Sequence, residues 1–185
     1  MPSPIGHALG GIAAGWGVAP RHDVAAAALL AAVAIAPDLD LLIGTHREIT
    51  HSIGAAVIVG VVAGTLWSSA FVLGRASRQG GLRRDAARWA AAVSLAWCSH
   101  LLLDWLSNDT RPPLGVMALW PFTYDYYKSS LEIFPPVSRR YWESRFWIYN
   151  LRAAVTEVVI LGPLAFLAVA SAFRRKSSGE RQTRT

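Results

Sequence analysis

Histidine and carboxylate side chains recur within and beside the apolar segments of this 185-residue chain. An ionisable group inside such a segment costs roughly 2.5–3.5 kcal/mol on membrane-insertion scales, so each one needs a partner or a function. His100 and Asp104 lie four residues apart in Ser-His-Leu-Leu-Leu-Asp, so a helix places both on one face. The other candidates are His7, Asp38, Asp40, His46, His51 and Glu157.

These residue types predict a divalent-metal site. Imidazole nitrogen and carboxylate oxygen suit Zn²⁺ best, with Mn²⁺ or Fe²⁺ as alternatives, and the single cysteine, Cys98, excludes a Cys-rich zinc site. The candidates outnumber the four ligands of one tetrahedral zinc, so two ions, or one ion with a catalytic carboxylate, are both open. Because a bound divalent ion makes water a better nucleophile, hydrolysis is the expected reaction class.

The candidates divide by expected role. For the primary metal our first choice is Asp40, His51, His100 and Asp104. His7, His46 and Glu157 would complete a second metal or supply the general base. A carboxylate is the better base, which favours Glu157, with Asp38 as the substitute.

Each candidate also has a structural explanation. The His100–Asp104 pair is equally typical of a hydrogen bond between helices. Asp38 and Asp40 could flank a turn, and Glu157 could pair with Arg152. Ser52 has no base placed for it by spacing, so a serine nucleophile is not expected.

The composition indicates a membrane protein, since 53% of the residues are hydrophobic and only 16% are charged. We predict an all-α, multi-pass membrane helical bundle. Three segments are long enough to span a bilayer: Ile53–Gly74, Ala86–Leu106 and Ala153–Phe173. Two shorter helices are expected before them, over Pro4–Ala19 and over Val24–Ala36, the second closed by Pro37.

The basic residues predict the orientation of these segments. They gather in two clusters: Arg75, Arg78, Arg83, Arg84 and Arg88, and then Arg174, Arg175, Lys176, Arg181 and Arg184. Each cluster adjoins an apolar segment, as cytoplasmic flanks of spans do, so membrane lipids rather than nucleic acid are the expected partners. With both clusters inside, alternating helices bring all eight candidates to the outer side, whereas His22 falls at the opposite end.

We expect a single membrane-embedded domain over residues 1–173, with a long connection and a tail. The connection, residues 107–152, holds 11 of the 19 aromatic residues. An interfacial aromatic belt and a lid over a site both fit this composition. The polar, basic tail over residues 174–185 is expected to be disordered.

The ordered motifs of the chain resemble those of the YdjM-like family, which are described as membrane-bound metal-dependent hydrolases. They are His7 in a Gly-rich run, Pro37-Asp38-Leu39-Asp40, His46-Arg47-Glu48-Ile49-Thr50-His51-Ser52, Ser99-His100-Leu101-Leu102-Leu103-Asp104 and Leu119-Trp120-Pro121-Phe122. The resemblance covers about residues 4–170. It implies metal-site roles for His7, Asp38, Asp40, His46, His51, His100 and Asp104.

A fainter likeness links the pattern to the zinc-dependent phospholipase C and P1 nuclease group, helical phosphoesterases with clustered zinc ions. This likeness implies phosphodiesters or lipid headgroups as substrates. The chain lacks a second late histidine block, so it departs from the three-zinc pattern of that group.

The sequence therefore predicts an integral membrane hydrolase, of the bacterial inner or plasma membrane, with its metal site toward the outer face. Its substrate would be a small-molecule or lipid ester or phosphoester. A metal-ion transporter or a metal-binding membrane scaffold is the alternative, although transporters place ligands near the midplane between repeated halves, and no repeat is visible here. A structural membrane protein with polar pairs between helices is the third possibility. Nothing in the sequence indicates the oligomeric state.

Overall fold

The computed structural model describes residues 1–44, 46–72, 79–109 and 112–182. Within these ranges the chain is helical and forms no β-strand, only two isolated bridges between loop residues. This confirms the predicted all-α class. The elements in chain order are α1 (Pro4–Gly15), α2 (Val24–Ile35), the 3₁₀ helices η1 (Ala36–Ile43) and η2 (Ile49–His51), α3 (Ile53–Val72), α4 (Gln79–Trp105) and α5 (Phe146–Gln182).

Three helical stretches of the described chain are long and apolar enough to cross a membrane: Val24–Ile43, Gly81–Trp105 and Phe146–Ala172. The second and third correspond to the predicted spans Ala86–Leu106 and Ala153–Phe173. The first differs from prediction, because Val24–Ala36 was expected to be a short helix. Pro37 ends the α-helical bonding but fits the first turn of a new helix, so α2 continues directly into η1.

The predicted span Ile53–Gly74 corresponds to α3, whose apolar stretch Ile53–Ser69 is shorter than the other three. Leu73 and Gly74 lie outside the described residues, as do Arg75 and Arg78 of the first basic cluster and Arg184 of the second. Helix α5 continues to Gln182, into the segment expected to be a disordered tail, whose last residues, 183–185, lie outside the described residues.

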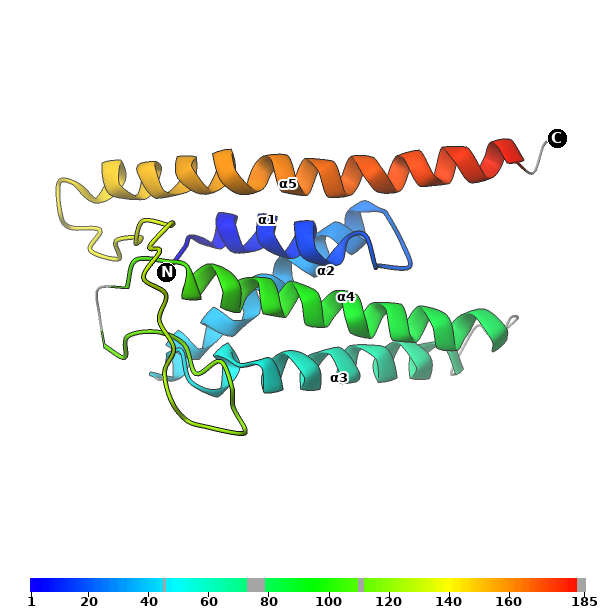
Figure 1. The fold of residues 1–185 in the computed structure, drawn as a ribbon, viewed down its shortest axis with the longest axis horizontal. Helices are drawn as coiled ribbons and strands as arrows, with labels where there is room; N and C mark the ends of the chain where they lie inside the picture. The colour runs from blue at the N-terminus through cyan, green and yellow to red at the C-terminus, as the bar shows by residue number, and fades with distance from the viewer. Residues whose placement is uncertain (45, 73–78, 110–111, 183–185) are drawn as a thin grey trace.

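Helix α4 lies at the centre of the bundle and packs against α1, α2 and α3, while α1 separates it from α5 (Figure 1). Small residues allow this close approach. A Cβ atom on Gly11 of α1 would lie 2.6 Å from the carbonyl oxygen of Leu30 in α2, and one on Gly15 would lie 2.7 Å from that of Ala92 in α4. The glycine-rich first helix is therefore fitted between its neighbours.

One end of the bundle gathers the start of α1, both 3₁₀ helices, the end of α4 and the start of α5 (Figure 1). The connection from α4 to α5 folds over this end. It is joined to α3 by hydrogen bonds from the backbone N–H groups of Ile53 and Gly54 to the carbonyls of Ala118 and Trp120. Seven of the eight candidate residues belong to α1, η1, η2, α4 or α5, with Glu157 about three turns into α5, and His46 lies in the loop between η1 and η2.

Candidate metal centre

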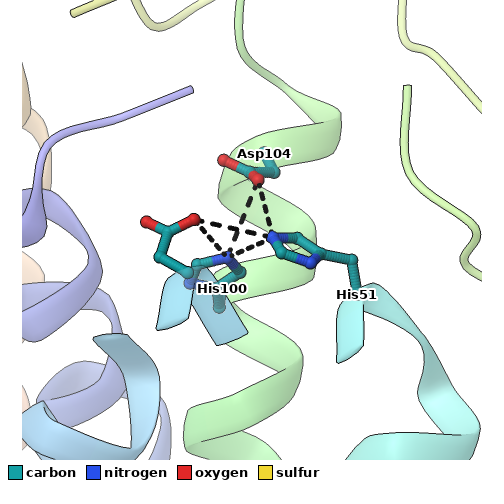
Figure 2. A group of neighbouring side chains, drawn as sticks. His51, His100 and Asp104 are labelled. Atoms are coloured by element: carbon teal, nitrogen blue, oxygen red, sulfur yellow. Dashed lines mark hydrogen bonds and ion pairs between the residues drawn. The ribbon is translucent and has the colours of Figure 1, made fainter. Parts of the chain in front are cut away.

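Two 3₁₀ helices and the end of α4 place the first group of candidate ligands. His100 and Asp104 lie one turn apart on α4, His51 ends η2, and Asp38 comes from η1. Figure 2 shows His51, His100 and Asp104 turned toward one another between these elements. His51 and His100 are fully buried, and the Asp104 side chain is equally inaccessible, whereas 12% of the Asp38 side chain is exposed.

One atom from each residue contributes to a compact four-atom set: Asp38 Oδ1, His51 Nε2, His100 Nε2 and Asp104 Oδ2. His51 Nε2 lies 3.4 Å from Asp104 Oδ2 and 3.6 Å from Asp38 Oδ1. His100 Nε2 lies 3.6 Å and 3.7 Å from the same two oxygens, and 3.0 Å from His51 Nε2.

These spacings fit the donor set of a divalent ion. Ligand atoms about 2.0–2.2 Å from a tetrahedral zinc lie about 3.4 Å from one another. The nitrogen–oxygen separations of 3.4–3.7 Å match that edge length and are too long for good hydrogen bonds. Accordingly, Asp38 Oδ1 and both oxygens of Asp104 are buried without a hydrogen-bond partner among the described residues. A buried carboxylate without partners is costly, so this arrangement favours a cation.

Hydrogen bonds on the far side of each imidazole orient the histidines. His100 Nδ1 lies 2.7 Å from the carbonyl oxygen of Ala34, which can only accept, so Nδ1 carries the proton and Nε2 presents its lone pair. His51 Nδ1 lies 3.1 Å from Asp40 Oδ2, which likewise leaves Nε2 facing the four-atom set. A proton donated to an outer acceptor is the usual device for fixing a metal-binding histidine.

Asp40 is the hydrogen-bond acceptor that supports this centre. Besides His51 it accepts from the Thr50 hydroxyl at 2.7 Å and from the Arg47 backbone N–H at 3.2 Å, and its Oδ1 lies 2.9 Å from His46 Nδ1. Asp40, His46 and His51 form a second group with metal-ligand spacing. Because the contacts of Asp40 are at hydrogen-bond distance, Asp38 rather than Asp40 joins His51, His100 and Asp104, which differs from our first choice.

The carboxylates around His51 favour its charged form. Burial by itself would lower the pKa of His51, but the carboxylates of Asp104, Asp38 and Asp40 raise it. The same negative charges that favour a proton on His51 would also favour a metal ion, which competes with protons for its ligands.

His7 lies on the other side of the two carboxylates. Its ring stacks on that of His100, with centroids 3.8 Å apart. His7 Nε2 lies 3.6 Å from Asp104 Oδ1 and 3.9 Å from Asp38 Oδ2, the oxygens that the four-atom set does not use. Both ring nitrogens of His7 are buried without a hydrogen-bond partner in the part of the chain that the structure describes.

Glu157 is placed differently. It is fully buried on α5, and both of its carboxylate oxygens accept hydrogen bonds from Ser3, Oε1 from the backbone N–H at 2.7 Å and Oε2 from the hydroxyl. Ser3 is also the N-cap of α1, where its side chain accepts from the Gly6 N–H. Glu157 therefore joins α5 to the start of α1, and it belongs to neither group with metal-ligand spacing.

A buried ion pair lies beside the centre. Arg47 Nη1 bonds to Asp109 Oδ2, which also accepts from the Gly115 backbone N–H at 2.7 Å. Burial would raise the pKa of Asp109, but Arg47 and the Gly115 N–H hold that pKa below its usual value. The pair fixes the loop after α4 against the segment that carries His46.

Three of the four first-choice ligands, His51, His100 and Asp104, lie together in the four-atom set, whereas several residues that orient them were not predicted. Arg47 and Thr50 lie inside the His46–Ser52 motif, which is the signal that could have found them. The Ala34 carbonyl carries no side-chain signal at all. Ser3 and Asp109 become recognisable only from the partners that the fold gives them.

Comparison with known proteins gives a family for the whole bundle. The chain matches the family described as YdjM inner membrane protein over residues 1–176, which includes every candidate ligand. No curated protein and no solved structure matches it. Together with the apolar helices long enough to cross a bilayer, the match identifies a membrane protein. The chain belongs to the YdjM inner membrane protein family.

Proposed function

We propose that this protein is a membrane-embedded, metal-dependent hydrolase that acts on an ester or phosphoester. The observation that carries the proposal is the four-atom set of Asp38, His51, His100 and Asp104, whose spacing and missing hydrogen bonds fit one divalent ion. Imidazole nitrogens and carboxylate oxygens in this ratio suit Zn²⁺, with Mn²⁺ and Fe²⁺ as alternatives. Catalysis would need a further ligand position for water on this ion, and Asp38, with 12% of its side chain exposed, is the ligand of the set that solvent reaches.

A divalent ion bound there would act as a Lewis acid and make water a stronger nucleophile. The residues of the chain hold and orient that chemistry. His51 and His100 present Nε2 because Asp40 and the Ala34 carbonyl hold their other nitrogens. Asp38 Oδ2 lies outside the four-atom set on the exposed carboxylate of the centre, and we assign to it the acceptance of the proton that water loses.

Glu157 was the base that the sequence favoured, with Asp38 as the substitute, and that role stays a prediction. Its engagement with Ser3 supports a positioning role instead. Replacing Glu157 by Gln separates the two. If Glu157 only positions α1 against α5, the Glu157→Gln variant should keep both metal and turnover. If Glu157 is the base, the variant should keep its metal but hydrolyse roughly 10²–10⁴-fold more slowly.

The primary test combines measurement of the bound metal with assays of hydrolysis on a panel of esters and phosphoesters. Purified protein should retain one tightly bound divalent ion per chain, and His100→Ala should lose it while keeping its helical circular-dichroism spectrum in detergent. The metal-loaded protein should hydrolyse at least one ester or phosphoester in a broad panel. Folded wild-type protein that hydrolyses a substrate without metal would contradict the proposal. Bound metal without any hydrolysis would favour the transporter or scaffold instead.

Metal stoichiometry also decides between one ion and two. Two ions per chain, falling to one in His7→Ala, would assign His7 and the outer oxygens of Asp38 and Asp104 to a second ion. We expect one ion, because in the described residues these outer contacts are the longer ones, up to 3.9 Å.

We further propose that the centre faces the outer side of the inner membrane. The two basic clusters support this, since positively charged flanks stay in the cytoplasm. Single-cysteine variants in a Cys98→Ala background test it. Cysteines replacing Gln79 and Ser178 should be labelled only from the cytoplasmic side and one replacing Ser130 only from outside. Labelling of positions 130 and 178 from the same side would overturn this orientation.

A further inference from the structure

A cavity of about 580 Å³ opens beside the metal centre. His46 and Arg47 line it, and His46 is bonded through Asp40 to His51 of the four-atom set. Arg139 and Arg140, from the segment before α5, line it as well. The cavity therefore adjoins residues that support the centre, although none of the four candidate ligands lines it.

The charges that line this cavity favour an anion. Three arginines and two carboxylates line it, so one guanidinium is left without a compensating carboxylate. Arg47 is held by the buried Asp109, whereas Arg140 pairs with Glu143 through side chains that are 54% and 40% exposed. Such an exposed pair contributes little and exchanges readily. Arg139 contacts the Met1 sulfur and has no carboxylate partner among the described residues.

The two arginines are presented by a fixed piece of loop. Asn150 on α5 holds Ser138 from both sides: its Oδ1 accepts from the Ser138 backbone N–H at 2.8 Å, and its Nδ2 donates to the Ser138 carbonyl at 3.0 Å. The Ser138 hydroxyl in turn accepts from the Arg140 N–H at 3.2 Å. These bonds hold the backbone that carries the two arginines, and planar guanidinium groups suit the oxygens of a phosphate, which they bind in a bidentate manner.

The surroundings of the arginines place the cavity at the level of lipid headgroups. Tyr141 and Trp142 follow Arg140 directly and are 76% and 69% exposed, and Trp147 at the start of α5 is 77% exposed. Exposed tyrosine and tryptophan of this kind mark the membrane–water interface. The apolar stretch of α5 begins at Phe146, so the arginines lie just outside the hydrocarbon region.

We propose that this cavity binds the phosphate group of a membrane lipid through Arg139 and Arg140, with the acyl chains left in the bilayer. The inference rests on the proposed function in one respect, that the bound headgroup is the substrate of the adjoining metal centre. The shared chemistry is a phosphate, which a water-soluble phosphoester also carries. The position beside exposed interfacial aromatics favours the lipid.

Calorimetric titration of the detergent-solubilised protein tests the proposal. The probes are a short-chain phosphatidic acid below its critical micelle concentration, the matching diacylglycerol, glycerol 3-phosphate and inorganic phosphate. The phosphatidic acid should bind most tightly. The double variant Arg139→Gln, Arg140→Gln should weaken its binding at least about tenfold, because two charge-assisted contacts are lost. The double Arg-to-Lys variant should retain part of the affinity.

Arg145→Gln is the matched control, since Arg145 is exposed nearby but does not line the cavity. It should bind like the wild type. Unchanged affinity in the double Gln variant, or binding of glycerol 3-phosphate as tight as that of the lipid, would overturn the proposal.

Titrations of metal-loaded and chelator-stripped wild-type protein separate this inference from the proposed function. Arginine-dependent lipid binding should persist in both. Protein that binds the lipid in this way but hydrolyses nothing would overturn the hydrolase proposal and leave the binding site standing. Hydrolysis of a phosphate-free ester by protein that does not bind the phosphatidic acid would overturn the lipid-binding site and leave the hydrolase proposal standing.

Discussion

Two buried carboxylates in the same bundle, those of Glu157 and Asp104, differ in whether they have hydrogen-bond partners. Glu157 on α5 has both oxygens bonded to Ser3, so its burial is satisfied within the fold. Asp104 on α4 is surrounded by His7, His51 and His100, yet neither of its oxygens has a hydrogen bond in the described structure. Because an unpartnered buried charge costs several kcal/mol, the surroundings of Asp104 favour a cation and those of Glu157 do not.

Asp109 gives a third case that clarifies the difference. It is buried like the other two, but its charge is met permanently by Arg47. Glu157 is therefore satisfied by neutral donors and Asp109 by a fixed cation, whereas an exchangeable cation would satisfy Asp104. Only the last arrangement is suited to holding a metal, since a fixed partner would compete with the ion.

The largest expected effect comes from removing the charge of Asp104. Asp104→Asn should weaken metal binding at least about 1,000-fold, or about 4 kcal/mol, because a ligand oxygen with no other partner is lost. Glu157→Gln should leave the metal affinity unchanged. Competition with a chromogenic chelator measures both, and equal losses in the two variants would erase the distinction between the acids.

The next largest effect concerns the buried ion pair of Arg47 and Asp109. Asp109→Asn should lower the free energy of unfolding by about 3 kcal/mol, because Arg47 is left buried without its partner. The pKa of Asp109 is depressed in the fold, so its stabilisation is complete above about pH 4 and disappears as the pH falls further. Denaturation in detergent at pH 7 and pH 3 should show the difference between wild type and variant shrinking in acid. A constant difference would contradict the assignment.

A smaller loss of metal affinity is expected from changing Asp40, which supports His51 from outside the four-atom set. Asp40→Asn should weaken metal binding about 10- to 100-fold, since His51 loses the carboxylate that orients it. The same chelator competition measures this change. A loss as large as that of Asp104→Asn would instead make Asp40 a direct ligand, as the sequence first suggested.

The smallest effect is expected from changing Ser3, the hydrogen-bond partner of Glu157. Ser3→Ala should lower the unfolding free energy by about 1–2 kcal/mol, because α1 loses its N-cap and Glu157 loses one donor. Metal content should not change. Thermal unfolding in detergent together with metal analysis checks both, and loss of metal would show that the Ser3–Glu157 contact also holds His7 in place.

Much of the fold and part of the centre could be predicted from the sequence because they depend on local periodicity. The i, i+4 spacing of His100 and Asp104 puts both on one face of α4 whatever the tertiary structure, and the apolar runs determine where helices form. The alternation of helices across a membrane then predicted that distant histidines share one end. His7, His51 and His100 do meet there.

The remaining choices belong to the tertiary structure. Asp38 and Asp40 are two residues apart, and only the 3₁₀ turns after Pro37 decide which one faces His51 Nε2 and which one faces its Nδ1. Glu157 pairs with Ser3, 154 residues away, and not with the neighbouring Arg152 that the sequence offered as an alternative. A sequence pattern specifies the direction of a side chain on its own helix. The partner it meets depends on how closely the helices pack, here set by glycines that let α1 lie between α4 and α5.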